Sequence, residues 1–140
     1  MVEGSALATT KALLARAVFA QGRVTEADEL CQAAADAAPT DDIFTQVIWR
    51  GVKAKVLAAE GHCEQAGALA REAVALVQPT DLLSLHGDAM LDLAEVLRAC
   101  GRTDDSNRAV RTGLSLYENK GNASGAARAR SLVRSLGGEG

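Results

Sequence analysis

The chain is poor in aromatic residues, prolines and strand-forming residues, and rich in residues that favour helices. Of its 140 residues, 3% are aromatic and two are proline, whereas 28 are alanine. Alanine, leucine, glutamate and arginine lose little side-chain freedom in a helix, so this composition favours helix throughout. With 48% hydrophobic and 24% charged residues, the composition is typical of a globular domain and excludes a disordered or membrane-embedded chain. We therefore predict a single all-α domain spanning residues 1–140.

The chain also lacks an overall excess of basic residues. Its net charge is −3 and its pI about 5.4, which gives no support for nucleic-acid binding. Residues 98–134 are an exception, with eight basic side chains against three acidic ones. A charge run of this kind usually forms a solvated helix face, and the alternative is a docking patch for an acidic surface.

Cysteines are few and far apart. Cys31, Cys63 and Cys100 lie 32 and 37 residues apart, and an odd number without short spacings is not typical of a disulfide framework. We expect free thiols, a reducing compartment and no zinc site, because zinc sites usually contain closely spaced pairs of ligands. The N-terminus lacks the pattern of a signal peptide. No stretch approaches the ~20 apolar residues of a membrane span, so we expect a cytoplasmic protein without membrane contact.

An internal repeat is the most informative feature of the sequence. Gly22, Gly61 and Gly101 are spaced 39 and 40 residues apart, and each follows a segment with helical hydrophobic spacing. Five residues after each glycine comes a small side chain, Ala27, Ala66 or Ser106. Glycine is favoured just after a helix end, where the backbone turns left-handed. Each unit is therefore predicted to be two antiparallel helices joined at a glycine.

The periodicity predicts three helical hairpins and a seventh helix that covers the open end. Pro-Thr-Asp sequences at 39–41 and 79–81 separate the units: proline ends one helix, and Thr or Asp caps the next. Asn122 is expected to cap the last helix. The predicted repeats are 5–39, 42–79 and 82–119, with a capping helix over 122–136. The individual helices are expected at 5–21, 24–38, 42–60, 63–77, 82–100, 103–119 and 123–136.

These units resemble tetratricopeptide repeats over nearly the whole chain. In the first unit the matching positions are Leu14, Ala15, Val18, Gly22, Ala27, Cys31, Ala34 and Pro39. In the second they are Ala54, Leu57, Gly61, Ala66, Ala70 and Ala73. In the third they are Leu93, Ala94, Leu97, Gly101, Ser106, Val110 and Gly113. The period of 39–40 residues exceeds the family's usual length of about 34. The resemblance implies an α-α superhelix with somewhat longer helices or turns.

The sequence is also similar to the C-terminal repeat region of large bacterial signalling proteins. The similarity lies in segments 46–61 and 85–102 and in the segment 114–133 that follows them. In those proteins a cyclase-like or transcription-regulator module and an ATPase module precede the repeats. This chain contains no phosphate-binding G-x-x-x-x-G-K-[ST] loop. The resemblance implies either a sensory or scaffolding piece on its own or a fragment of a longer polypeptide. We predict no catalytic residues, no metal ligands and no cofactor.

The resemblance also places candidate binding residues, because the first helix of each hairpin lines the concave surface of a stacked array. The predicted groove residues are Arg16, Phe19, Ile48, Lys55, Asp88, Leu91, Glu95 and Arg98. Trp49 either packs between hairpins or is an exposed anchor for a partner.

The resulting hypothesis is a non-catalytic regulatory scaffold that binds a peptide or partner protein in its groove. The alternatives are a small-molecule sensor, and a module that forms homo-oligomers through an uncovered end hairpin near Leu13 and Phe19.

Overall fold

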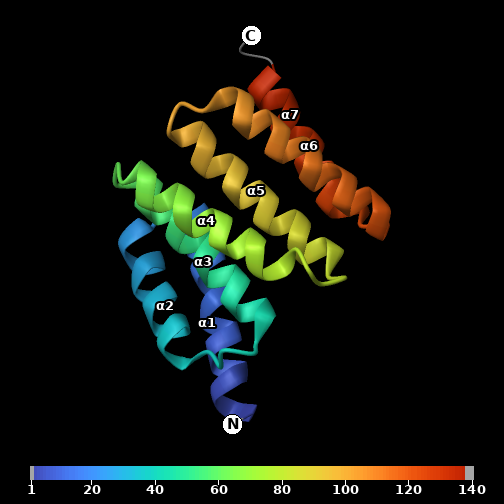
Figure 1. Ribbon diagram of the computed structural model, residues 1–140. Helices are drawn as coiled ribbons and strands as arrows, with labels where there is room; N and C mark the ends of the chain where they lie inside the picture. Colours follow the sequence, from blue (N-terminus) through green and yellow to red (C-terminus); the bar gives the residue numbers. More distant parts are fainter. Residues whose placement is uncertain (1, 138–140) are drawn as a thin grey trace.

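Residues 2–137 fold into seven α-helices that form hairpins stacked one on the next (Figure 1). The computed structural model describes the backbone of residues 2–137 and the side chains of residues 6–134. The helices are α1 (Val2–Ala20), α2 (Val24–Ala37), α3 (Ile43–Ala59), α4 (Cys63–Val77), α5 (Leu83–Ala99), α6 (Thr103–Lys120) and α7 (Ala123–Gly137). Each predicted helix is present, and the predicted boundaries differ from the observed ones by at most three residues.

Stacking in one direction makes the array a superhelix and not a closed bundle. Within each hairpin α1 packs on α2, α3 on α4 and α5 on α6. The first helices also form a row, α1 on α3 on α5 on α7, while α2, α4 and α6 each pack on the first helix of the next unit. The first and last helices, α1 and α7, lie at opposite ends of the array in Figure 1. Among residues 2–137 we find no strand, and α1 does not pack on α7.

The tight turns depend on glycine, as the sequence predicts. Gly22, Gly61, Gly101 and Gly121 have φ angles of +83°, +87°, +79° and +79°, in the left-handed region that costs other residues steric energy. At each of these turns the backbone folds back onto the end of the helix, as in the bond that the Arg102 amide donates to the Leu97 carbonyl at 2.8 Å.

The small residues five positions after each turn glycine are buried where the two helices of a hairpin approach. Ala27, Ala66 and Ser106 have 0% exposure, and Ala126 has 4%. The Ser106 hydroxyl donates to the Ala94 carbonyl at 2.7 Å, which satisfies the one polar group at these positions. The absence of a larger side chain lets the helices approach closely.

Side-chain caps start two of the helices. The Asp42 carboxylate accepts from the Thr45 amide at 3.2 Å, and the Asn122 side-chain oxygen accepts from the Gly125 amide at 2.9 Å. Both bonds satisfy amides that have no partner within the helix. Asn122 therefore caps α7, as predicted.

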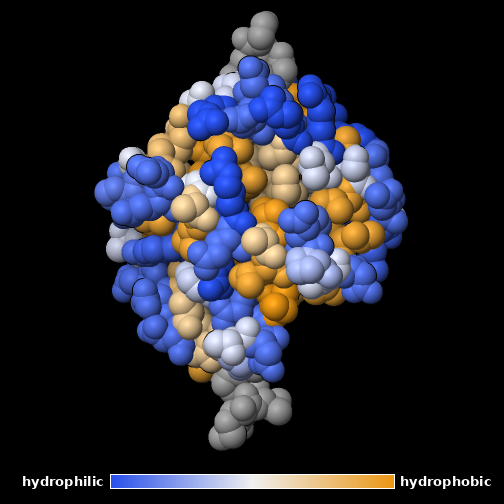
Figure 2. Space-filling view, in the orientation of Figure 1, coloured by the Kyte–Doolittle hydropathy of each residue, from blue (hydrophilic) through white to orange (hydrophobic). Residues whose placement is uncertain are grey.

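The core runs continuously along the array, built mostly from small and medium-sized side chains. Four buried clusters follow one another between the hairpins. Trp49 is half-buried against the cluster containing Val47, Ala73 and Leu85. Its indole nitrogen donates to Gln46 at 3.0 Å, and the Arg50 guanidinium lies 4.5 Å from the ring centre. On the face that carries α4 and α6, hydrophilic and hydrophobic residues alternate (Figure 2).

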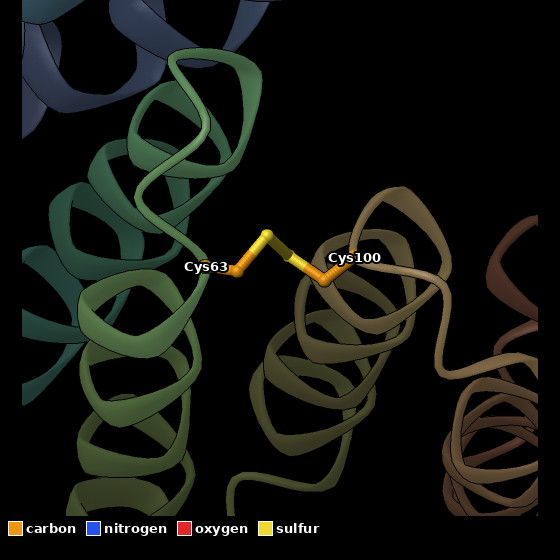
Figure 3. Close-up of a disulfide and its surroundings, with 2 residues drawn as sticks. All are labelled: Cys63 and Cys100. Atoms are coloured by element: carbon orange, nitrogen blue, oxygen red, sulfur yellow. A yellow bond between two sulfur atoms is a disulfide. The ribbon is translucent and has the colours of Figure 1, made fainter.

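The prediction of three free thiols is wrong for two of them. Cys63 and Cys100 form a disulfide, with Cα atoms 5.8 Å apart (Figure 3). Cys63 is the first residue of α4 and Cys100 follows the last residue of α5. Stacking brings these ends together because the two residues flank equivalent turn glycines in consecutive hairpins. Cys31 is a free, buried thiol, and burial raises its pKa to about 12.

Candidate functional site

The first helices of the hairpins, together with α7, surround a cavity of about 740 Å³ on the concave side of the superhelix. Side chains from α1, α3, α5 and α7 all line it, which places it across the whole row of first helices. Apolar side chains, including Phe19, Leu91 and Leu132, form part of the wall. Apart from Ser131, the polar side chains of the wall are charged, and these charges are organised around α5.

Seven of the eight predicted groove residues line this cavity: Arg16, Phe19, Lys55, Asp88, Leu91, Glu95 and Arg98. The eighth, Ile48, does not. Its side chain is 2% exposed and belongs to a core cluster with Val47 and Val77. The prediction for Ile48 is wrong because α3 packs against α1, α2, α4 and α5, so that little of its first half faces the concave side. Trp49 does not line the cavity either.

Three carboxylates, Asp88, Asp92 and Glu95, follow one face of α5 along the cavity wall. Residues four and three apart lie on the same side of a helix, so these like charges repel unless cations separate them. Lys55 of α3 supplies one cation, with its Nζ 3.1 Å from Asp92 Oδ1 and 3.1 Å from Glu95 Oε2. Burial alone would lower the pKa of Lys55, but these two carboxylates outweigh burial and raise it. Lys55 is therefore a permanent positive charge in the wall.

Of the two carboxylates that pair with Lys55, Asp92 is more buried than Glu95, with 14% of its side chain exposed. Burial raises the pKa of Asp92, and the neighbouring Glu95 and Asp88 carboxylates add to this rise against the opposing effect of Lys55. Space for its carboxylate comes from Gly51 of α3. A Cβ atom at Gly51 would lie 2.1 Å from Asp92 Oδ2. The close approach of α3 and α5 and the position of this carboxylate therefore depend on each other.

Asp88 is held by three other helices. It accepts from the Tyr117 hydroxyl of α6 at 2.6 Å and from Arg128 of α7 at 2.9 Å. Arg128 also donates to the Tyr117 oxygen at 2.7 Å. Arg16 of α1 lies further away, with its Nη1 3.8 Å from Asp88 Oδ2. One carboxylate thus connects the first, third and last parts of the array.

Tyr117 belongs to a second helix but reaches the concave side through a gap formed by two glycines. Its ring is fully buried, and Cβ atoms built at Gly87 of α5 and Gly125 of α7 would lie 2.6 and 2.5 Å from ring carbons. Burial and the hydrogen bond to Asp88 raise the pKa of the hydroxyl. The hydroxyl therefore remains a neutral donor to Asp88 across the physiological pH range.

Sequence reasoning missed Asp92, Tyr117 and Arg128. Asp92 could have been predicted from helical spacing, because it lies four residues after Asp88 and three before Glu95, on the helix face that is predicted to line the groove. Tyr117 and Arg128 lie outside the predicted groove helices, and only the packing of α6 and α7 on α5 brings them to Asp88.

Two arginines at the cavity have no close ion pair with a carboxylate among the described side chains. Arg98 forms no ion pair with any side chain of residues 6–134, and Arg16 has only the long contact to Asp88. Lys55 and Arg128, by contrast, are committed to carboxylates of α5. The arrangement is a wall whose carboxylates are paired internally, with apolar patches and two arginines available to a ligand. Such a wall is suited to holding a ligand.

The described side chains offer no cluster of three or more potential metal ligands. Within residues 2–137, no helix combines the length and apolar character required to cross a bilayer. Comparison with known proteins gives no assignment: no family model matches the chain, and no curated protein matches its sequence.

Proposed function

We propose that the protein is a non-catalytic interaction module that binds a peptide segment of a partner protein in its concave cavity. The observation that carries this proposal is the cavity of about 740 Å³ lined by all four helices of the concave row. An extended or helical segment lying across the row would contact every hairpin, with apolar side chains against Phe19 and Leu91. Arg16 and Arg98 are available to polar groups of such a segment.

The wall is already organised before a ligand arrives. Lys55, Arg128 and Tyr117 hold the α5 carboxylates through contacts of 3.1 Å or less. Fixed side chains and packed helices lose little freedom on binding, so the ordering cost falls mainly on the partner. A preformed groove on a repeat scaffold is the geometry that a tetratricopeptide-like interaction module requires. The proposed setting is the sensory or scaffolding part of a bacterial signalling regulator.

A small-molecule sensor is the second candidate, and the size of the cavity favours it. Pockets for drug-sized ligands have volumes of roughly 300–1,000 Å³, a range that includes this one. An inducer bound between the α5 wall and α1 would stabilise one spacing of the hairpins. That spacing would be the signal passed to an attached domain.

Substituting alanine with arginine inside and outside the cavity tests the proposal. Ala59 is exposed and lines the cavity, so Ala59→Arg fills part of it at little cost to folding. Ala75→Arg introduces the same side chain at an exposed position of α4 and is the matched control. A random-peptide library is selected on the wild-type protein, and the binders are then tested on both variants.

Peptides that bind the wild-type protein and Ala75→Arg but lose affinity for Ala59→Arg support the proposal. Metabolites that raise the melting temperature of the same two proteins, but not that of Ala59→Arg, favour the sensor instead. Ligands of either kind that bind all three proteins equally would show that the concave cavity is not the binding site.

Self-association is a third candidate, favoured by exposed leucines on α1. Leu7 and Leu14 are 52% and 48% exposed, whereas Leu13 and Phe19, the residues expected to be uncovered, are partly buried against core clusters. Light scattering of the wild-type protein and of Leu7→Glu/Leu14→Glu tests this candidate. An oligomer that dissociates in the variant supports it, and a monomeric wild-type protein at high concentration rejects it.

A further inference from the structure

The Cys63–Cys100 disulfide lies in a surface recess that is separate from the proposed binding groove. The recess has a volume of about 310 Å³ and is lined by residues of α4, α5 and the turn after α5. Both cysteines line it, and both are half-buried. A disulfide in an open recess is accessible to an incoming thiolate, and access is one requirement for thiol–disulfide exchange.

The two sulfur atoms occupy opposite electrostatic environments. Cys63 is the first residue of α4, and Cys100 follows the last residue of α5. The unpaired amides at a helix N-terminus stabilise negative charge, whereas the carbonyls at a C-terminus disfavour it. A thiolate is therefore more stable on Cys63 than on Cys100.

A guanidinium that lines the same recess and folds back along α4 adds to this asymmetry. Arg71 lines the recess, and its Nη1 lies 2.9 Å from where a Cβ atom of Gly67 would be. The glycine thus leaves the space in which Arg71 folds back toward the start of α4. Arg102 also lines the recess, but its guanidinium pairs with Asp105. Glu64 contributes one carboxylate, and Arg71 forms no ion pair with the described side chains, so Arg71 is the cation of the recess that is available to a thiolate.

We propose that Cys63–Cys100 is a thiol–disulfide exchange site that reacts with a dithiol reductant, with Cys63 as the leaving thiolate. One thiolate of the reductant forms a bond to Cys100 Sγ, the Cys63–Cys100 bond breaks, and its electron pair stays on Cys63. The second thiolate of the reductant then attacks the mixed disulfide and releases Cys100. The protein gains two electrons and two protons, and the reductant leaves as a disulfide.

This exchange acts on the junction between the second and third hairpins. The disulfide joins the start of α4 to the end of α5, at the ends of these helices away from the turn that connects them. The packing of α4 on α5 through Ala66, Ala70 and Leu97 does not require it. Reduction therefore leaves the stack assembled and removes the covalent tie between the start of α4 and the end of α5. Cys31 does not take part, because it is buried and its pKa is raised to about 12 by that burial.

The first test is reduction of the folded full-length chain by dithiothreitol without denaturant, followed by alkylation and peptide mass mapping. We expect Cys63 and Cys100 to be alkylated and Cys31 to stay unmodified. Reduction that requires unfolding in urea would overturn the proposal.

The second test measures the asymmetry through alkylation by iodoacetamide at pH 7. Cys100→Ser leaves Cys63 as the reactive thiol, and Cys63→Ser leaves Cys100. We expect Cys63 to react about tenfold faster, because a helix N-terminus lowers a thiol pKa and raises the thiolate fraction. Equal rates, or a faster Cys100, would overturn the assignment of the leaving group.

Arg71 provides the matched control. In the Cys100→Ser background, Arg71→Gln should slow alkylation of Cys63 by about threefold, since a nearby cation favours the thiolate. Arg71→Lys should restore most of the rate. Arg111→Gln removes the same charge from an exposed position on α6 and should leave the rate unchanged. If the Arg71 and Arg111 variants react alike, the recess does not tune Cys63.

Discussion

Removing the Cys63–Cys100 disulfide should lower the free energy of unfolding by a large and calculable amount. The bridge joins residues 37 apart in sequence. Restricting a loop of that length in the unfolded chain costs it about 13 cal/mol/K of entropy, which corresponds to about 4 kcal/mol at 25 °C. For a chain of this size a loss of 4 kcal/mol corresponds to a fall in melting temperature of about 10–15 °C. Few single changes in the molecule should have a comparable effect.

The assay is urea unfolding followed by circular dichroism on three samples. These are the oxidised wild-type protein, the same protein reduced with a phosphine, and the double variant Cys63→Ser/Cys100→Ser. The reduced wild-type protein is the essential control because it loses the chain restriction but keeps both sulfur atoms. We expect the reduced protein and the variant to have similar unfolding midpoints, well below that of the oxidised protein.

A difference of less than about 1 kcal/mol in the free energy of unfolding between the oxidised and reduced proteins would contradict this prediction, because the restricted loop should contribute about 4 kcal/mol. A Cys63→Ser/Cys100→Ser variant much less stable than the reduced protein would instead indicate that the two sulfur atoms stabilise the fold through their packing, since the reduced protein keeps them. Hydrogen exchange locates the effect, because repeats contact only their neighbours. Protection should fall most at the start of α4 and the end of α5.

Three further predictions concern the α5 wall. Tyr117→Phe removes the buried hydroxyl that donates to Asp88 at 2.6 Å and should cost about 1.5–3 kcal/mol in urea unfolding. An equal loss in an Asp88→Ala background, which lacks the acceptor, would contradict this. Gly51→Ala should destabilise by about 1–2 kcal/mol despite the higher helix propensity of alanine, because the new Cβ displaces Asp92; in an Asp92→Ala background the same change should be neutral or stabilising. Because the folded pKa of Asp92 is raised, its contribution to stability is complete below the unfolded value of 3.8 and is lost as pH rises through the folded pKa. The wild-type protein should therefore gain stability relative to Asp92→Asn as pH falls from 7 to that value, and a pH-independent difference in thermal melting would refute the shift.

The helices and turns follow from interactions between residues close together in sequence. A glycine after a helical stretch, a small residue five positions later and an Asn cap at residue 122 are local signals, and each is confirmed by the structure. Repetition of these signals about every forty residues also predicts stacking, because one hairpin alone leaves an apolar face exposed.

The sequence predicts the candidate site less completely than it predicts the fold. Repeat register correctly places Lys55 and Glu95 on one cavity wall, since positions on one helix face are set by its period. The register places Ile48 wrongly, because α3 is surrounded by four other helices and Ile48 is buried among them. The register alone also gave no indication that Tyr117 crosses from a second helix to the concave side.

The amino-acid sequence alone determined the seven helices, their turns and the order in which hairpins follow one another, because propensity and periodicity act within one unit. Tertiary structure alone decided which side chains from different hairpins meet. The disulfide, the Gly51–Asp92 contact and the binding of Asp88 by Tyr117 and Arg128 depend on how closely successive hairpins approach and at what angle. Those quantities come from the packing of whole helix faces, which no short stretch of sequence specifies.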